Sequence, residues 1–317
     1  HRCEDACTRG NVDNPVAIDE VKKFIANQEL DSGSRFVPKK KYSDGKKIAV
    51  IGGGPAGLTC AYYLAVYGHH VTVFEKMDQP GGMLKYGLPS FRLEKDVVDA
   101  EIEVLKDLGV EFKTGVEVGK DITLNKLRTQ GYKGFYLAIG AQGGRKAGIE
   151  GEDAKGVLTG IDFLRDINMG KTQNLSGRTV VVGGGNVAID VARTAVRAGS
   201  SQVSMYCLES RDIMPAADDE IEEAEAENIT INNSWGPKRI VVEDGKLKGI
   251  EFKKCVRVFD EENRFSPLYD ENDTVIVECE NVLMTIGQSI EWKNLLDGSK
   301  VELNRNQTAK ANGFTYQ

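Results

Sequence analysis

The most constraining feature of this sequence is a glycine cluster that occurs twice. Residues 50–59 read VIGGGPAGLT, and residues 181–190 read VVGGGNVAID. Each cluster follows an apolar run typical of a buried strand and precedes a run typical of a helix. A glycine-rich turn between a strand and a helix brings backbone N–H groups and the helix N-terminus against a pyrophosphate. The repetition therefore predicts two dinucleotide-binding units in one chain.

The first unit matches the dinucleotide fingerprint throughout. Gly52, Gly54 and Gly57 have the spacing of its three glycines, and Glu75 ends the next apolar run. The first glycine makes the tight turn, the second allows close approach to the pyrophosphate, and the third lets the helix pack on the strand. A carboxylate at the end of the second strand accepts hydrogen bonds from the ribose hydroxyls.

The second unit carries the same pattern with alanine in the third place. Gly183, Gly185 and Ala188 are followed by Glu209, which ends the run SMYCLE. One such pattern is a weak signal. Two copies with strand, helix and acid in the same order make purely structural turns a poor explanation. The pair of sites suggests one flavin dinucleotide and one nicotinamide dinucleotide.

Composition narrows the class of protein. The chain has 317 residues, enough for two domains, and a formal net charge of −7. An acidic chain without an aromatic-rich basic stripe argues against nucleic-acid binding, and no apolar run approaches the ~20 residues of a membrane helix. The six cysteines do not form a secreted disulfide framework, which favours a cytoplasmic location. The chain begins without Met, so we expect it to be part of a longer protein.

Apolar periodicity divides the remaining sequence into elements. Residues 18–25 predict a helix with four apolar residues on one face, and residues 31–46 predict a polar linker. Residues 134–141 predict another buried strand. Short strands are expected between residues 239 and 284, with a hairpin turn at Asp244–Gly245.

Further motifs extend the pattern beyond the two glycine turns. The chain also contains CEDAC, FEK, GGMLKYGLPSFRL, LAIGA, GIEGED, MPA and TIGQ. With these motifs in this order over nearly its whole length, the chain resembles the glutamate synthase small (beta) subunit family of NAD(P)H-dependent FAD/iron–sulfur oxidoreductases. That family includes the matching half of dihydropyrimidine dehydrogenase. The resemblance implies an α/β fold with two Rossmann-like dinucleotide-binding domains of the glutathione-reductase kind.

The resemblance also implies how the chain is divided. Residues 1–45 would be the C-terminal part of a helical iron–sulfur domain and a linker. Residues 46–145 and 284–317 would form a discontinuous FAD-binding domain, into which residues 146–283 are inserted as the NAD(P)-binding domain. The similar motifs LAIGA and TIGQ would mark the two places where the chain crosses between these domains.

Two sets of cofactor-binding residues follow from the resemblance. The residues that would hold FAD are Gly52, Gly54, Pro55, Ala56, Gly57, Glu75, Gly82, Met83, Arg92, Val118 and Gly140. The residues that would hold NAD(H) or NADP(H) are Gly183, Gly185, Asn186, Val187, Ala188, Glu209 and Arg211. Hydride transfer between two cofactors needs no acid–base side chain, so no catalytic residue is predicted.

The choice of nicotinamide coenzyme depends on the residues before the Met-Pro-Ala turn. Family members that use NADPH carry an arginine pair there, and a guanidinium suits a 2′-phosphate. This chain has Leu208 and Glu209 in that place. We expect Glu209 to favour the free ribose diol of NADH, although Arg211 could still reach a phosphate.

Electrons that leave the flavin need a further carrier, and the resemblance implies a [4Fe–4S] cluster. Cys3 and Cys7 have the spacing of the last two ligands in the family's iron–sulfur domain. Such a cluster needs four ligands, so two more are expected upstream of this sequence. Lys22 departs from the family, because some relatives supply a Gln or Glu ligand near this position. A flavin-binding Gly-Asp segment is likewise expected beyond Gln317.

The resemblance implies an enzyme that passes hydride from NAD(P)H to FAD, and then single electrons to iron–sulfur clusters and a partner subunit. An alternative is an NADH-linked electron-transfer subunit of a hydrogenase, formate dehydrogenase or ferredoxin oxidoreductase complex. A second alternative is a non-catalytic scaffold subunit with an empty flavin site. The expected partner is an electron-accepting subunit or a ferredoxin-like protein in a hetero-oligomer, with no nucleic acid and no membrane.

Overall fold

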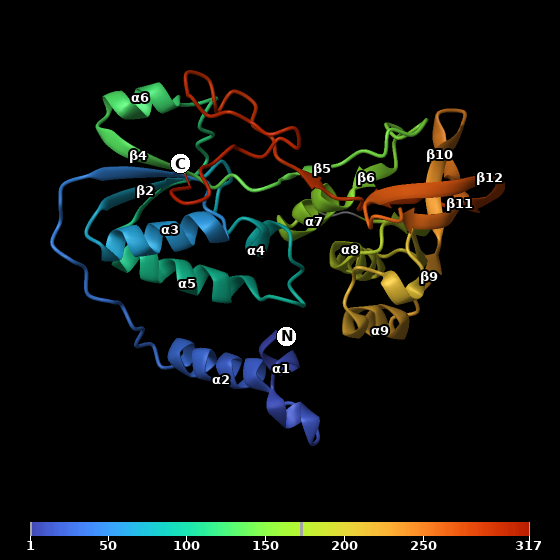
Figure 1. Cartoon of the computed structure of the whole chain (residues 1–317), viewed down its shortest axis with the longest axis horizontal. Helices are drawn as coiled ribbons and strands as arrows, with labels where there is room; N and C mark the ends of the chain where they lie inside the picture. The colour runs from blue at the N-terminus through green and yellow to red at the C-terminus, as the bar shows by residue number, and fades with distance from the viewer. Residues whose placement is uncertain (1, 172–173, 317) are drawn as a thin grey trace.

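The computed structural model describes residues 2–171 and 174–316 and contains two parallel sheets, one on each side of the molecule in Figure 1. The first sheet has the strand order β3-β2-β1-β4. Its strands are β1 (Lys47–Ile51), β2 (His70–Phe74), β3 (Glu111–Lys113) and β4 (Tyr132–Leu137). Because side chains alternate along β1, Val50 packs under α3 (Pro55–Val66) and α5 (Lys95–Asp107), whereas Ala49 and Ile51 pack toward α6 (Leu124–Thr129).

The second sheet repeats this arrangement with five strands in the order β6-β13-β7-β8-β9. They are β6 (Val157–Thr159), β7 (Arg178–Val182), β8 (Gln202–Cys207), β9 (Thr230–Asn233) and β13 (Asn281–Met284). Every pair is parallel. One face is covered by α7 (Gly160–Asn168), α8 (Asn186–Arg197) and α9 (Asp218–Ala226). The two strand–turn–helix units predicted from the glycine clusters, β1–α3 and β7–α8, are thus confirmed.

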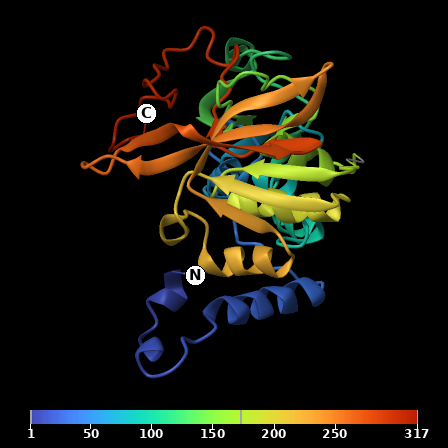
Figure 2. The same cartoon turned by 90° about the vertical axis from the view of Figure 1, so that its right-hand side faces the viewer.

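A three-stranded antiparallel sheet packs on the other face of the second sheet (Figure 2). Its strands are β10 (Trp235–Glu243), β11 (Lys246–Phe259) and β12 (Phe265–Glu278). The predicted hairpin is confirmed, because Asp244 and Gly245 have φ values of 51° and 72°, as a type I′ turn requires. The prediction of short strands is wrong: β11 and β12 have 14 residues each, since bulges let one ladder continue past irregular pairing.

Two short strands connect the half of the molecule that contains the first sheet, called the first half, to the half that contains the second sheet, called the second half. β5 (Gly143–Gly144) follows the LAIGA motif. It pairs antiparallel with β14 (Gln288–Ser289), which begins at the last residue of the TIGQ motif. The two segments that run between the sheets therefore lie side by side. The predicted strand over residues 134–141 is shorter than expected and is not buried. β4 ends at Leu137, and Tyr136 is 42% exposed because β4 is the edge strand of its sheet.

The N-terminal helices lie apart from both sheets in Figure 1. They are α1 (Arg2–Asp5), the 3-10 turn η1 (Thr8–Asn11) and α2 (Ile18–Asp31). The helix predicted from residues 18–25 is confirmed, but its apolar face is open: Val21, Phe24 and Ile25 are each more than half exposed. The expected linker is extended and runs against the first half, where Lys41 N–H donates to Val66 O over 2.9 Å.

Candidate functional site

The first glycine turn connects the end of β1 to the start of α3. Gly52 N–H donates to Phe74 O over 2.8 Å, which fixes the turn at the carboxyl edge of the sheet. The φ of Gly52 is 106°, and a Cβ there would lie 2.3 Å from Ala138 O, so a larger residue does not fit. Gly54 is the N-cap of α3, and a Cβ on Gly57 would lie 1.9 Å from Gly52 O. The turn therefore brings helix and strand into backbone contact and leaves the first N–H groups of α3 without intrahelical partners.

Glu75 lies just beyond the end of β2, and two backbone N–H groups hold its carboxylate. Oε2 accepts from Gly53 over 2.7 Å and Oε1 accepts from Met77 over 2.8 Å. The residue is only 6% exposed, so these hydrogen bonds offset the cost of burying its charge. They also direct the carboxylate toward the glycine turn, where the acid of a dinucleotide site meets the ribose.

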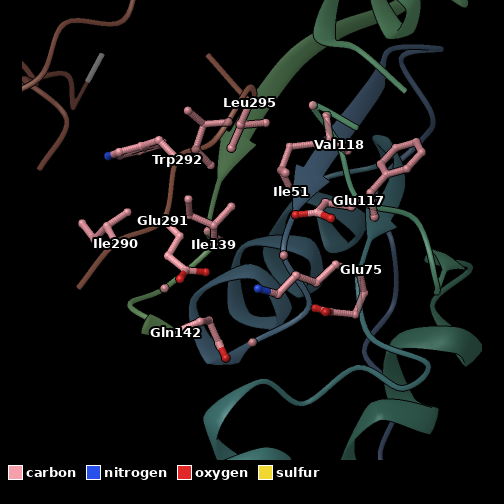
Figure 3. Close-up of a pocket in the computed structure, with 18 of the residues that line it drawn as sticks. Ile51, Glu75, Glu117, Val118, Ile139, Gln142, Ile290, Glu291, Trp292 and Leu295 are labelled. Atoms are coloured by element: carbon pink, nitrogen blue, oxygen red, sulfur yellow. The ribbon is translucent and has the colours of Figure 1, made fainter. Parts of the chain in front are cut away.

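A cavity of about 700 Å³ opens at this turn (Figure 3). Its size is typical of a small-molecule or cofactor site. The predicted FAD residues that line it are Gly52, Gly54, Pro55, Ala56, Glu75, Gly82, Met83, Val118 and Gly140. Gly57 lies beneath the turn against Gly52 and supports the wall without lining it.

Part of the cavity wall was not anticipated from the sequence. The labelled side chains of this kind in Figure 3 are Ile51, Glu117, Ile139, Gln142, Ile290, Glu291, Trp292 and Leu295. Four of them follow β14, where the chain has just returned from the second half. Lys293 Nζ donates to Glu117 Oε1 over 2.8 Å, which closes this segment against the first half and lowers the pKa of Glu117. Residues 290–295 contain no recognisable motif. The only feature of the sequence that could have indicated them is their position just after the TIGQ motif, where the chain returns to the first half.

Gly82 lies directly against the first glycine turn. A Cβ on Gly82 would lie 2.6 Å from Gly54 Cα, and its φ is 54°. Two glycines thus face each other at the cavity, and neither carries a side chain that would cover the N-terminus of α3. Met83 begins α4 (Met83–Tyr86) and lines the cavity beside them.

Arg92 is a predicted FAD residue that is not among the residues lining this cavity. Its Nε donates to Asp190 on α8, and its Nη2 lies 3.1 Å from Glu220 Oε2 on α9. The neighbouring Phe91 ring lies 4.3 Å from the guanidinium carbon of Arg197. The FRL residues at the end of the GGMLKYGLPSFRL motif therefore connect the first half of the molecule to α8 and α9 of the second half. The connection forms because the carboxylates of Asp190 and Glu220 attract Arg92.

The second glycine turn has the same construction. Gly183 N–H donates to Tyr206 O over 2.9 Å, as Gly52 does to the end of β2 in the first turn. Gly185 is the N-cap of α8, and Ala188 is fully buried against the strand. Asn186 Oδ1 accepts from the N–H of Ala217 over 2.9 Å, which fastens the Met-Pro-Ala segment to the turn. Val187 is 42% exposed at the start of α8.

The acid of the second unit stands over its glycine turn. A Cβ on Gly184 would lie 2.9 Å from Glu209 Oε2, so this carboxylate occupies the space above the turn. Arg211 begins the 3-10 turn η2 (Arg211–Ile213), and its guanidinium lies 3.7 Å from Glu225 on α9. The predicted nicotinamide residues are thus brought together around one turn, with Arg211 directed toward α9.

Cys3 and Cys7 lie in the N-terminal segment, away from both turns. Cys3 Sγ donates to Asp19 Oδ1 over 3.6 Å. Backbone hydrogen bonds from Val16 and Arg9 lower the pKa of Cys7, which favours its thiolate form. Within residues 2–171 and 174–316, no group of three or more His, Cys, Asp and Glu side chains is placed to hold a metal.

The fold and the paired turns define a chain with two Rossmann-like units, each with a glycine turn at the start of a helix. The family model of the pyridine nucleotide-disulphide oxidoreductases matches residues 10–134 and 46–315. The chain belongs to this family.

Curated relatives narrow the comparison. The chain is 37% identical to the NADP(+)-dependent formate dehydrogenase subunit beta of Moorella thermoacetica, over 99% of this chain and 48% of that protein. It is 33% identical to the glutamate synthase [NADPH] small chain of Escherichia coli (strain K12), over 78% of this chain and 55% of that protein. The resemblance predicted from the motifs is confirmed. The chain spans about half the length of these curated relatives.

A solved structure shares the fold. Mycobacterium tuberculosis FprA in complex with NADPH has a TM-score of 0.70 at 18% identity, over 82% of this chain and 73% of that one. The likeness confirms the predicted α/β fold with two Rossmann-like domains. None of the helices in the described part of the chain is long and apolar enough to cross a membrane.

Proposed function

We propose that this chain is the dinucleotide-binding part of an NAD(P)H-dependent flavoprotein oxidoreductase. FAD would occupy the cavity at the β1–α3 turn, and the nicotinamide coenzyme would bind at the β7–α8 turn. The observation that carries the proposal is the cavity itself, which runs from the exposed N-terminus of α3 and the buried carboxylate of Glu75 to the 290–295 segment.

The residues around the cavity fit FAD. Gly54 and Gly82 both line the cavity without side chains, so their backbone is open to a pyrophosphate. The free N–H groups and partial positive charge of the 12-residue helix α3 favour that anion. Glu75 would accept hydrogen bonds from the adenosine ribose. Ile139 and Leu295 supply an apolar wall for a flat ring, and Gln142 supplies polar groups.

The chain's own contribution is binding, orientation and electrostatics. When bound, FAD accepts hydride from a reduced nicotinamide and returns the electrons singly to other carriers. Gly183, Gly185, Asn186, Val187 and Ala188 would hold the coenzyme's pyrophosphate at the N-terminus of α8. The domain boundaries predicted from the resemblance, residues 46–145 with 284–317 and residues 146–283, belong to this proposal.

We propose that a [4Fe–4S] cluster in the full protein accepts electrons from the flavin. Cys3 and Cys7 would supply two ligands, and the remaining ligands would come from outside the described residues. The names of the relatives support a hetero-oligomer, because one is a beta subunit and the other is a small chain. We propose an electron-accepting partner, such as a dehydrogenase subunit, the glutamate synthase large subunit or a ferredoxin-like protein. The six free cysteines favour a cytoplasmic location.

The test is an anaerobic titration of the FAD-reconstituted chain with NADH and with NADPH, followed by the visible absorbance of oxidised flavin. Bleaching of one flavin per chain is the expected result. Bound flavin that neither coenzyme reduces would contradict the oxidoreductase assignment. Failure to bind FAD would favour the scaffold alternative.

A further inference from the structure

The two acids of the dinucleotide units occupy equivalent positions over their glycine turns. At the first turn, a Cβ on Gly53 would lie 3.1 Å from Glu75 Oε2. At the second turn, a Cβ on Gly184 would lie 2.9 Å from Glu209 Oε2. In both cases the middle glycine of the GGG run has the carboxylate directly above it. The adenosine ribose of FAD carries a free 2′-hydroxyl, so equivalent geometry at the second turn indicates a second ribose with a free diol.

The segment that carries Glu209 is fixed by backbone contacts on both sides. Asn233 Nδ2 and Ser234 N–H donate to Glu209 O over 3.0 and 3.1 Å. Further along, Ala216 N–H donates to Gly184 O over 3.1 Å. These contacts fix the backbone of Glu209 beside the turn, and a preorganised backbone limits the positions that its carboxylate can take.

The charges near this carboxylate disfavour a 2′-phosphate. A carboxylate accepts two hydrogen bonds from a ribose diol, but it repels the dianionic phosphate of NADPH. The guanidinium of Arg211 lies 3.7 Å from Glu225 Oε2, so part of its charge is already offset by another carboxylate. Asp212 adds a further carboxyl group to the same 3-10 turn.

We infer that the second turn selects NADH over NADPH and that Glu209 is the specificity-determining residue. The inference rests on the proposed function, since it concerns the coenzyme of that same site. It separates this chain from relatives whose names specify NADP(+) or NADPH.

The experiment compares kcat/KM for anaerobic flavin reduction by NADH and by NADPH in three forms of the FAD-reconstituted chain. Wild type should prefer NADH by at least about tenfold, because a 2′-phosphate would meet a carboxylate. Glu209→Arg should shift the ratio toward NADPH by at least about tenfold, because a guanidinium pairs with phosphate. Glu225→Gln is the matched control: it frees Arg211 without altering Glu209, and the NADH preference should remain.

Three results would overturn the inference: an equal or stronger preference of wild type for NADPH, an unchanged ratio in Glu209→Arg, or a reversal in Glu225→Gln. Dissociation constants for NADH and NADPH are measured in parallel by calorimetry. If neither coenzyme reduces the flavin, the proposed function fails, whereas the binding ratio still tests the role of Glu209. Equal binding of both coenzymes by wild type would then reject it.

Discussion

Replacing Gly54 with alanine separates the packing role of the first glycine turn from its binding role. Gly54 has φ −80° and ψ −177°, which alanine adopts without strain, and the new methyl would meet Gly82 Cα at an ordinary 3.6 Å. The free energy of unfolding should therefore change by no more than about 1 kcal/mol, since lower unfolded-state entropy and loss of a favourable N-cap nearly cancel. The methyl would instead stand where a phosphate approaches the N-terminus of α3.

The expected loss in FAD binding follows from one hydrogen bond. A hydrogen bond to a charged group contributes about 1.5–3 kcal/mol, so losing one should weaken FAD binding by about 10- to 150-fold. The dissociation constant is measured by equilibrium titration, and stability by urea denaturation of the same Gly54→Ala protein without FAD.

Gly185→Ala is the matched control at the second turn. Its methyl would lie 3.9 Å from Pro215 Cγ, and φ is −96°, so the protein accommodates it equally well. This variant should bind FAD as wild type does but require more coenzyme for flavin reduction. Unchanged FAD affinity in Gly54→Ala would refute the reasoning. A loss of more than about 3 kcal/mol in stability would show instead that packing requires the glycine.

Three further predictions concern thiols, the contact between the halves, and acid stability. Burial raises the pKa of Cys207 and Cys279 to about 12. At about pH 8 both thiols should therefore resist iodoacetamide until the chain unfolds. Mass spectrometry of the labelled native protein would contradict this if it found either cysteine modified. Arg92→Ala should lower the free energy of unfolding in urea by about 1.5–3 kcal/mol, because two carboxylates lose their guanidinium; a change below about 0.5 kcal/mol would contradict it. Hydrogen bonds from Arg239 and its neighbouring lysine lower the pKa of Glu251, so its stabilisation is present above the unfolded pKa of about 4.3 and is lost as pH falls through the lower folded value. The melting temperature of Glu251→Gln should therefore fall less than that of wild type on acidification, and parallel curves would exclude the effect.

The parts of the site that were predicted from the sequence are those that a short segment specifies. The strand, glycine turn and helix are contiguous, and the fixed geometry of the unit then places Glu75 at the same turn. This is why the sequence alone predicts that Gly52, Gly54 and Glu75 line one site. In the same way, the contiguous unit that begins at Gly183 predicts that Glu209 lies at the second glycine turn.

The parts that were missed depend on contacts between distant segments. The partner of Arg92, Asp190, lies 98 residues further along the chain, and no local pattern specifies that pairing. Trp292 and Leu295 reach the cavity only because β14 pairs with β5 and returns the chain to the first half. Such residues carry no periodicity or motif, so only the assembled fold reveals them.

Strand burial and length were misjudged for related reasons. The apolar run around Tyr136 suggested a buried strand, but its neighbours in the sheet are set by the strand order, which leaves β4 at an edge. β11 and β12 continue past polar stretches because each supplies backbone partners to the other.

The account's central claim is that the cavity at the first glycine turn binds FAD, and an equilibrium titration of the FAD-free chain tests it most directly. Trp292 lines the cavity, whereas the other tryptophan, Trp235, lies in β10 of the second half. The account predicts saturable quenching of tryptophan fluorescence at one FAD per chain, with flavin remaining bound through gel filtration. Absence of saturable quenching, with no flavin eluting alongside the protein, would contradict it.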